Sequence, residues 1–165
     1  MGAGGTPASS KGNRVAINRI TTEASPETVF AILADPDCYA QWVVGSSELR
    51  DVDGDWPRVG ATFHHTQFLP RVGLKDTTSV LECEPPHRIR LCVRSRPLVI
   101  AEVELRLRAS SEGGAKIEMS EEPVGAFVGK FDNPLFQWSL KLRNTESLRR
   151  LKKLAEERQR SAPVS

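Results

Sequence analysis

The segment His87–Ala109, HRIRLCVRSRPLVIAEVELRLRA, contains two strand-length runs that are separated at Pro97. In the first run Ile89, Leu91 and Val93 alternate mainly with arginines. In the second run alanine, valine and leucine residues alternate in the same way with glutamate and arginine. Alternation with a period of two predicts strands that have one apolar and one charged face. The segment therefore predicts an antiparallel hairpin in a sheet with a dry side and a wet side.

The charged face of this hairpin carries both signs of charge. If the two apolar sets share one face, Arg94 and Arg96 can lie near Glu102 and Glu104 as cross-strand ion pairs. The whole chain is balanced as well, with 23 basic and 21 acidic residues and a net charge of +2. We therefore expect a solvated, charge-paired surface here rather than a phosphate or nucleic-acid site, and no nucleic-acid partner.

Further segments of strand length flank the hairpin on both sides. Turn-forming residues such as Pro85-Pro86 and Ser110–Gly114 separate them, and the gaps are too short for crossover helices. Consecutive strands must then pair antiparallel, which predicts a curved sheet of about seven strands. The predicted strands outside the hairpin cover residues 14–22, 48–52, 60–68, 74–84 and 115–122.

Helix start signals occur at three places. Ser25-Pro26-Glu27 supplies an N-cap, a first-turn proline and an acidic residue, and Asp35-Pro36 repeats the signal for a second short helix. Asn133-Pro134 opens a long helix that we expect to end near Arg158. Its length of roughly 37 Å is enough to cover a strand of ten residues, so it can lie along the whole dry face. A single apolar stripe is predicted on it: Leu135, Trp138, Leu142, Thr145, Leu148, Leu151 and Ala155.

Residues 14–159 are enough for one domain with a real core and too few for two. The small polar residues at 1–13 and the segment 160–165 are predicted to be flexible tails. No run approaches the ~20 apolar residues of a membrane span, and no apolar run precedes Lys11, so we expect a cytoplasmic protein. The three cysteines lack Cys-x-x-Cys spacing, which predicts neither a disulfide framework nor a zinc site.

Several motifs are similar to those of a known superfamily. Residues 24–42 open with ASPETVF and continue through DP and YAQW, which resembles the start of START-like proteins. VLECEPPHRI at 80–89 and LRRLK at 148–152 resemble a mid-sheet strand pair and the C-terminal helix of the same group. Over roughly residues 14–157 the chain resembles the bacterial SRPBCC proteins labelled polyketide cyclase/dehydrase and lipid transport. The resemblance implies an α+β helix-grip fold, in which the long helix closes the curved antiparallel sheet over a cavity.

Two neighbouring strands carry candidate polar residues for this cavity. His64 and His65 are adjacent on a strand, so they point to opposite faces and cannot chelate one metal together. At most one faces inward, where it could act as a general acid or base or could simply be hydrogen-bonded within the core. Asp76 and Thr78 share one face of the next strand, and that face could be buried or exposed to solvent. If Asp76 is buried, its pKa rises and it can donate a proton or anchor a ligand.

The last strand and the helices supply the remaining candidates. Glu121 follows Met119 at a two-residue step, so it lies on the apolar face near the strand end, where it could anchor a ligand hydroxyl or reach solvent at the rim. Trp42, Met119 and Trp138 could be cavity walls or plain core residues. Phe127 lies in an apolar segment with two glycines that could be a mobile lid or a packed loop. The candidate cavity set is Trp42, His64, His65, Asp76, Thr78, Met119, Glu121, Phe127, Trp138 and Leu142.

Three hypotheses for the function remain open. The first is binding or carriage of a hydrophobic small molecule, such as a lipid, an isoprenoid or a polyketide-like aromatic, by a monomer or homodimer. The second is a cofactor-independent cyclase or dehydratase that uses acid–base residues in the same cavity. The third is a protein-interaction domain with a vestigial cavity. We weigh the binder above the enzyme. Nucleotide-binding, nucleophile-elbow and metal-ligand motifs are lacking in the sequence, so we expect no cofactor and no metal.

Overall fold

The structure is a computed structural model that describes residues 16–69, 72–95, 99–124 and 133–162, with side chains except at 47–50, 66–69, 72–75, 95 and 99. In chain order its elements are β1 (Ala16–Thr22), α1 (Pro26–Leu33), the 3-10 helix η1 (Pro36–Cys38), α2 (Tyr39–Trp42), β2 (Ser46–Asp53), β3 (Thr62–Leu69), β4 (Val72–Glu84), β5 (Arg88–Ser95), β6 (Val99–Ala109), β7 (Ala115–Val124) and α3 (Pro134–Ser161). This order confirms the predicted helix-grip architecture of the α+β class.

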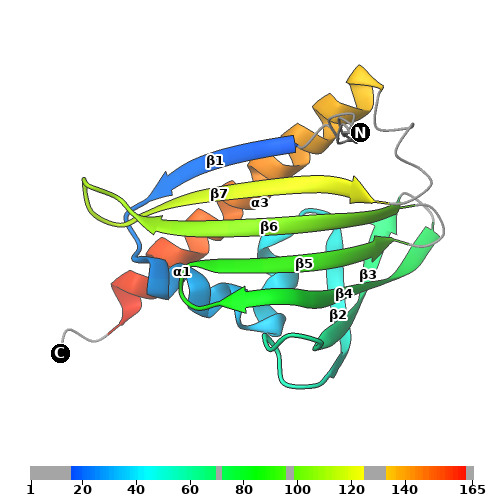
Figure 1. Cartoon of the computed structure of the whole chain (residues 1–165), viewed down its shortest axis with the longest axis horizontal. Coiled ribbons are helices and arrows are strands. Elements are labelled where there is room, and N and C mark those ends of the chain that lie inside the picture. The colour runs from blue at the N-terminus through cyan, green and yellow to red at the C-terminus, as the bar shows by residue number, and fades with distance from the viewer. Residues whose placement is uncertain (1–15, 70–71, 96–98, 125–132, 163–165) are drawn as a thin grey trace, which may run out of the picture.

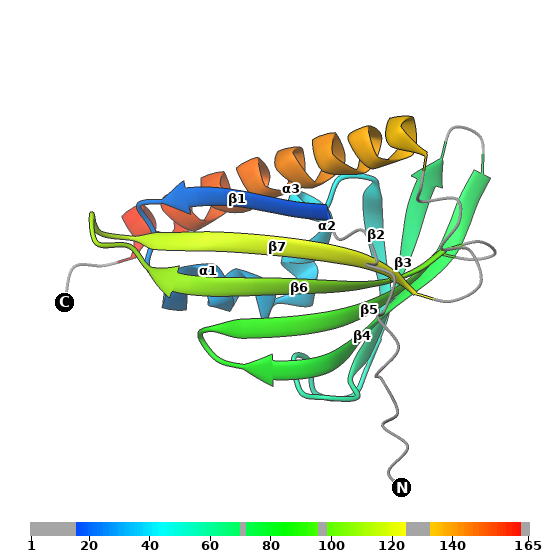
Figure 2. The ribbon, with the colours of Figure 1, turned by 45° about the horizontal axis from the view of Figure 1, so that its top comes forward.

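The seven strands form one antiparallel sheet in the order β1-β7-β6-β5-β4-β3-β2. Figures 1 and 2 show the sheet curving around the helices, which all lie on one of its sides. The long helix α3 packs against β1, β7, α1 and α2. The sheet therefore has an inner face, covered by helices, and an outer face.

The register of β5 against β6 differs from the predicted one. Residues of equal parity are paired, as expected, with Arg90 opposite Glu104. Arg94, however, lies opposite Ile100, so the expectation that Arg94 pairs with the glutamates of β6 is wrong. Alternation alone indicates which residues share a face but not how close to the turn the pairing begins. In the structure the pairing begins close to the turn, so the glutamates of β6 lie opposite the first half of β5. Arg96 lies outside the described residues.

One half of the interior is a packed apolar core. Leucine and isoleucine side chains of the sheet meet the C-terminal half of α3 and the buried face of α1. Fully burying one such side chain contributes about 1.5–3 kcal/mol. The fully buried leucines and isoleucines of this core are Ile32, Ile89, Leu105, Leu107, Ile117, Leu148 and Leu151.

Polar contacts hold the same half of α3 against β1 and the start of α1. The carboxylate of Glu156 accepts hydrogen bonds from the Thr22 hydroxyl (3.0 Å) and the Glu23 backbone N–H (3.1 Å). Partial burial acts to raise the pKa of Glu156, but these bonds and the charge of Lys152 outweigh it, so its pKa is lowered. The Gln159 side chain also accepts from the Ser25 backbone N–H (2.7 Å). The C-terminal half of α3 is therefore fixed by both apolar and polar contacts.

The ends of α3 are set by its capping residues. Asn133 caps the helix as predicted, because its side chain accepts a hydrogen bond from the Leu135 N–H (2.9 Å). The helix ends at Ser161 rather than near Arg158, so the predicted C-terminal tail at 160–165 begins too early. The predicted N-terminal tail at 1–13 lies outside the described residues. Within the described ranges, no helix combines the length and apolar composition that crossing a membrane requires.

Candidate functional site

The interior changes character toward the N-terminal half of α3. There the buried residues of the helix are Leu140, Asn144 and Ser147, two of them polar, in place of the leucines of the other half. Between this part of α3, α2 and the sheet, the described residues bound a cavity of about 50 Å³. Its apolar walls are formed by Val43, Leu91, Val93, Ala101, Val103 and Met119.

Glu121 is buried on the inner face of β7, and its side chain points at α3. It is 4% exposed, and its Oε2 accepts hydrogen bonds from Arg143 Nη2 (2.7 Å) and Asn144 Nδ2 (2.8 Å). Arg143 also donates to Asn144 Oδ1 (3.2 Å), so the three side chains form one closed network. A buried carboxylate is costly unless it is paired in this way. Of the two placements left open for Glu121, the structure shows the buried one.

Tyr39, at the start of α2, is a neutral side chain within electrostatic range of this network. Burial raises the pKa of the Tyr39 phenol to about 12, because the phenolate would lose its hydration. The hydroxyl of Thr78 and the positive charge of Arg143 oppose this rise in pKa. The carboxylates of Glu121 and Asp76 reinforce it. Tyr39 therefore remains protonated over the physiological range and can donate a hydrogen bond.

The candidates on β3 and β4 are divided between the two faces of the sheet. His65, Asp76 and Thr78 are all buried, and His65 lies opposite Asp76 in the strand register. The His65 ring packs edge-on against Tyr39 with 5.2 Å between ring centroids. His64 instead lies on the outer face, where its Nε2 is 2.8 Å from Asp53 Oδ2. Its inclusion in the cavity set is therefore corrected, as strand alternation requires for one of two adjacent histidines.

Trp42 lies in the cavity wall, next to the polar groups. It is buried, and its ring meets Tyr39 edge-on with 5.5 Å between centroids. The indole Nε1 is buried and has no hydrogen-bond partner among the described residues. An indole N–H is a donor only, so the cavity wall holds a donor with no acceptor beside it in the described part of the chain.

Two candidates on α3 do not line the cavity. Trp138 is 60% exposed and Leu142 is 50% exposed, so their predicted place inside the cavity is corrected here. Both lie on the side of the helix that faces away from the sheet, whereas Leu140 and Asn144 face the interior. Phe127 lies outside the described residues.

Four polar residues of the site were absent from the sequence-based set: Tyr39, Arg143, Asn144 and Ser147. Counting back in steps of four residues from the buried Leu148 reaches Asn144 and Leu140, and the same count from Leu151 reaches Ser147 and Arg143. Helical periodicity therefore carried a signal for the helix residues. Ser147 accepts a hydrogen bond from the Val44 backbone N–H (3.1 Å), which ties α3 to the end of α2. In the described part of the chain, no group of three or more histidine, cysteine, aspartate or glutamate side chains is placed to hold a metal ion.

Comparison with known proteins identifies the family. A model of the family described as polyketide cyclase / dehydrase and lipid transport matches residues 17–156. The chain belongs to this family.

Several solved structures share the fold of this chain. Protein CV1439 from Chromobacterium violaceum is 23% identical, with a TM-score of 0.68 over 86% of this chain and 97% of that chain. SA2116 from Staphylococcus aureus, a protein of unknown function, is 10% identical, with a TM-score of 0.72 over 90% and 96% of the two chains. CalU16 from Micromonospora echinospora is 21% identical, with a TM-score of 0.60 over 88% and 79%. No curated protein matches the chain.

Proposed function

We propose that this protein binds a small, largely apolar molecule with a hydrogen-bond-accepting oxygen, in the cavity between α3 and the sheet. The observation that carries the proposal is the buried Nε1 of Trp42, which has no partner among the described residues although it lies in the cavity wall. An unsatisfied buried donor costs about 1–3 kcal/mol, and a ligand oxygen would recover that free energy. The neutral phenol of Tyr39 provides a second donor nearby.

The size of the cavity bears on how a ligand would enter. About 50 Å³ holds one or two water molecules, whereas sites for drug-sized ligands measure about 300–1,000 Å³. A larger ligand therefore requires the N-terminal half of α3 to separate from the sheet. Among the described residues the apolar contacts there are few, because Leu140 belongs with Ala16 and Phe136 to a small cluster apart from the main core. Binding then includes a widening of the cavity, as in induced fit.

The test compares two tryptophan variants that differ in location. Trp42→Phe removes the buried N–H and keeps most of the ring, whereas Trp138→Phe makes the same change at an exposed position. Native mass spectrometry and organic extraction of the purified protein would first identify any co-purifying molecule. If none is found, a panel of lipids and aromatic polyketides serves as the set of probes. We expect Trp42→Phe to weaken binding by about tenfold and Trp138→Phe to leave it unchanged. Equal affinities of both variants, or no binding to any probe, would contradict the proposal.

A second function, a cyclase or dehydratase, is favoured by one observation. Four ionisable side chains, Tyr39, His65, Asp76 and Glu121, are buried in the same region of the interior. The protonated phenol of Tyr39 is within electrostatic range of both carboxylates, so an acid and a base can act on one bound molecule. Chemical change of a bound probe by the wild-type protein, lost in Tyr39→Phe while binding persists, would support the enzyme over the carrier. If the wild-type protein bound the probes but converted none of them, a cyclase or dehydratase activity on those probes would be excluded.

A further inference from the structure

The outer face of the sheet is charged, and most of its arginines are neutralised by glutamates. Arg19 Nε lies 2.7 Å from Glu118 Oε2. Arg88 and Arg106 lie opposite each other in the β5–β6 register, and the carboxylate of Glu104 bonds to both, at 3.0 Å from Arg88 Nε. Two like charges directly opposite each other are destabilising, and here a carboxylate relieves the repulsion. The charge-paired surface predicted from the hairpin sequence is confirmed for this part of the face.

Arg108 and Lys116 are not neutralised in this way by a glutamate of the described residues. They lie directly opposite each other in the register of β6 against β7, so they are again a cross-strand pair of like charges. Neither makes an ion pair or a side-chain hydrogen bond with any residue in the described ranges. The pair resembles Arg88 and Arg106, but without the carboxylate that joins those two.

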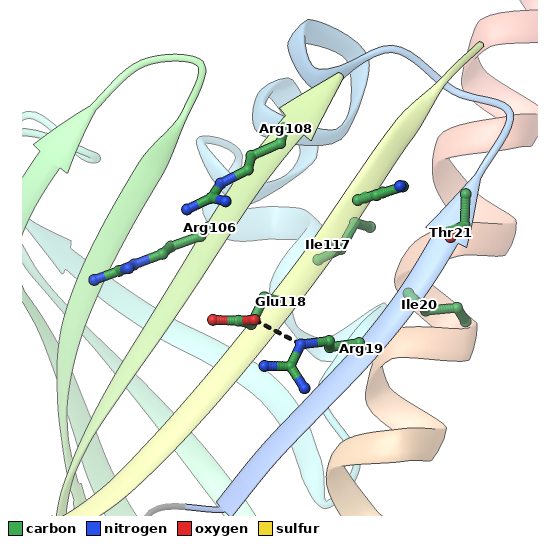
Figure 3. Close-up of a pocket in the computed structure, with 8 residues that line it drawn as sticks. Arg19, Ile20, Thr21, Arg106, Arg108, Ile117 and Glu118 are labelled. Carbon is green, nitrogen blue, oxygen red and sulfur yellow. Dashed lines mark hydrogen bonds and ion pairs between the residues drawn. The ribbon is translucent and has the colours of Figure 1, made fainter. Parts of the chain in front are cut away.

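A hollow on the outer face lies at this pair. It has a volume of about 480 Å³, and its polar lining is Arg19, Thr21, Arg106, Arg108, Lys116 and Glu118. Figure 3 shows Arg106 and Arg108 extending side by side from β6, and the Arg19–Glu118 ion pair on the neighbouring strands. A second hollow of about 460 Å³ also includes Arg106 and Arg108. Arg108 thus borders open space on two sides and carries a charge that no described residue neutralises.

We propose that this pocket binds a phosphate group, held by Arg108 and Lys116, with the Thr21 hydroxyl as a further donor. A guanidinium offers a planar pair of N–H groups that matches two phosphate oxygens, and an ammonium adds a compact second charge. A phosphate dianion would offset both unpaired charges at once. Glutamates neutralise Arg19, Arg88 and Arg106, so the described residues form no extended basic surface around the pocket, and the site fits one compact anion and not a nucleic acid. This site lies on the face opposite the cavity and does not depend on the proposed function.

The first test is a titration of the full chain with inorganic phosphate at constant ionic strength. Binding is monitored by NMR, through the amide resonances of residues 106–108 and 115–118. We expect saturable shifts in these residues and a rise in thermal stability. Arg108→Gln and Lys116→Gln should each weaken phosphate binding by about tenfold. Because each change also removes a like-charge contact, both variants should remain at least as stable as the wild type without phosphate.

The matched control is Arg94→Gln, which removes the same charge from an exposed arginine elsewhere on β5 that makes no ion pair with a described residue. It should change phosphate affinity by less than about twofold. A parallel arm measures binding to phosphatidylcholine vesicles with and without phosphatidic acid. Binding of free phosphate that depends on Arg108 supports a soluble phosphate ester as the ligand. Binding only to phosphatidic acid vesicles, with the same dependence on Arg108, supports a lipid headgroup. No saturable binding in either arm, or equal loss in Arg94→Gln, would overturn the proposal.

Discussion

Tyr39 allows the electrostatics of the cavity to be tested with one side chain. Burial raises the pKa of its hydroxyl from 10.0 to about 12. Because the folded-state pKa lies above the unfolded-state pKa, the neutral phenol contributes its full stabilisation below pH 10, and this is lost as pH rises from 10 to 12. The chain has one tyrosine, so absorbance at 295 nm in an alkaline titration reports Tyr39 alone. We expect a transition near pH 12, accompanied by loss of the far-ultraviolet circular dichroism signal.

The control for this titration is the same protein in concentrated urea, where the tyrosine should titrate near its ordinary pKa of 10.0. A folded protein whose tyrosine titrated at that value would show that water reaches the phenol. The polar network described around Glu121 would then be a solvated rim and not an interior site.

Sequence reasoning succeeded at residues where alternation is regular. β7 pairs without a bulge along its whole length, so Met119 and Glu121 lie on the inner face as expected. The choice between His64 and His65 needed the structure. Each face of this strand carries both polar and apolar residues, so alternation does not indicate which face is buried. Asn144 was missed for another reason: a polar residue adds nothing to a hydrophobic pattern, and its burial depends on a partner, Glu121, on a distant strand.

At the scale of elements, α3 shows how one helix can carry two apolar stripes. Leu148 and Leu151 belong to the stripe that was predicted, and they are buried in the core. In the first turns, however, Leu135 and Trp138 are exposed, while Leu140 is buried. The bulkier residues lie on the outer stripe there, so hydrophobicity alone favoured the wrong face. The correct stripe could be found only by continuing the spacing backward from the C-terminal half.

The turn between β6 and β7 fixes the end of β1, and glycine is required in it. Gly114 has φ +73°, and a Cβ on it would lie 2.0 Å from the carbonyl oxygen of Thr22. Gly114→Ala should therefore destabilise the fold by about 3 kcal/mol or more, since it combines a left-handed alanine with a backbone clash. Gly113 also has a positive φ, +92°, but a Cβ there meets nothing within 4 Å.

Gly113→Ala is the matched control, and we expect it to cost only about 1–2 kcal/mol, the conformational term alone. Urea unfolding monitored by circular dichroism measures both variants. Equal losses of stability would mean that β1 can move away from the turn without cost. The inner face near Thr22 and Glu156 would then be less firmly fixed than the hydrogen bonds of Glu156 indicate.

At the scale of the whole molecule, the interior has two halves of different chemistry. One half is a continuous apolar core, closed by the C-terminal half of α3. The other half contains the polar network of Glu121, Arg143 and Asn144 and the small cavity. The sequence predicted the architecture because strands and helices follow from periodicity. It did not predict this division, which arises where polar residues of separate elements meet.

The two halves should differ in local stability, because α3 is anchored by the continuous apolar core and by Glu156 at one end. At the other end the described residues supply only a small apolar cluster, together with the hydrogen bonds to Glu121. We expect amide hydrogens of residues 138–143 to exchange about tenfold faster than those of residues 148–155 when measured by hydrogen–deuterium exchange at neutral pH. A ligand that enters the cavity should slow exchange in the first segment and leave the second unchanged, since only the first half of α3 must separate from the sheet. Uniform protection along α3, with or without a ligand, would mean that the helix does not open there. The cavity would then accept only a molecule of about the size of water, and the outer-face pocket would be the remaining candidate for a larger ligand.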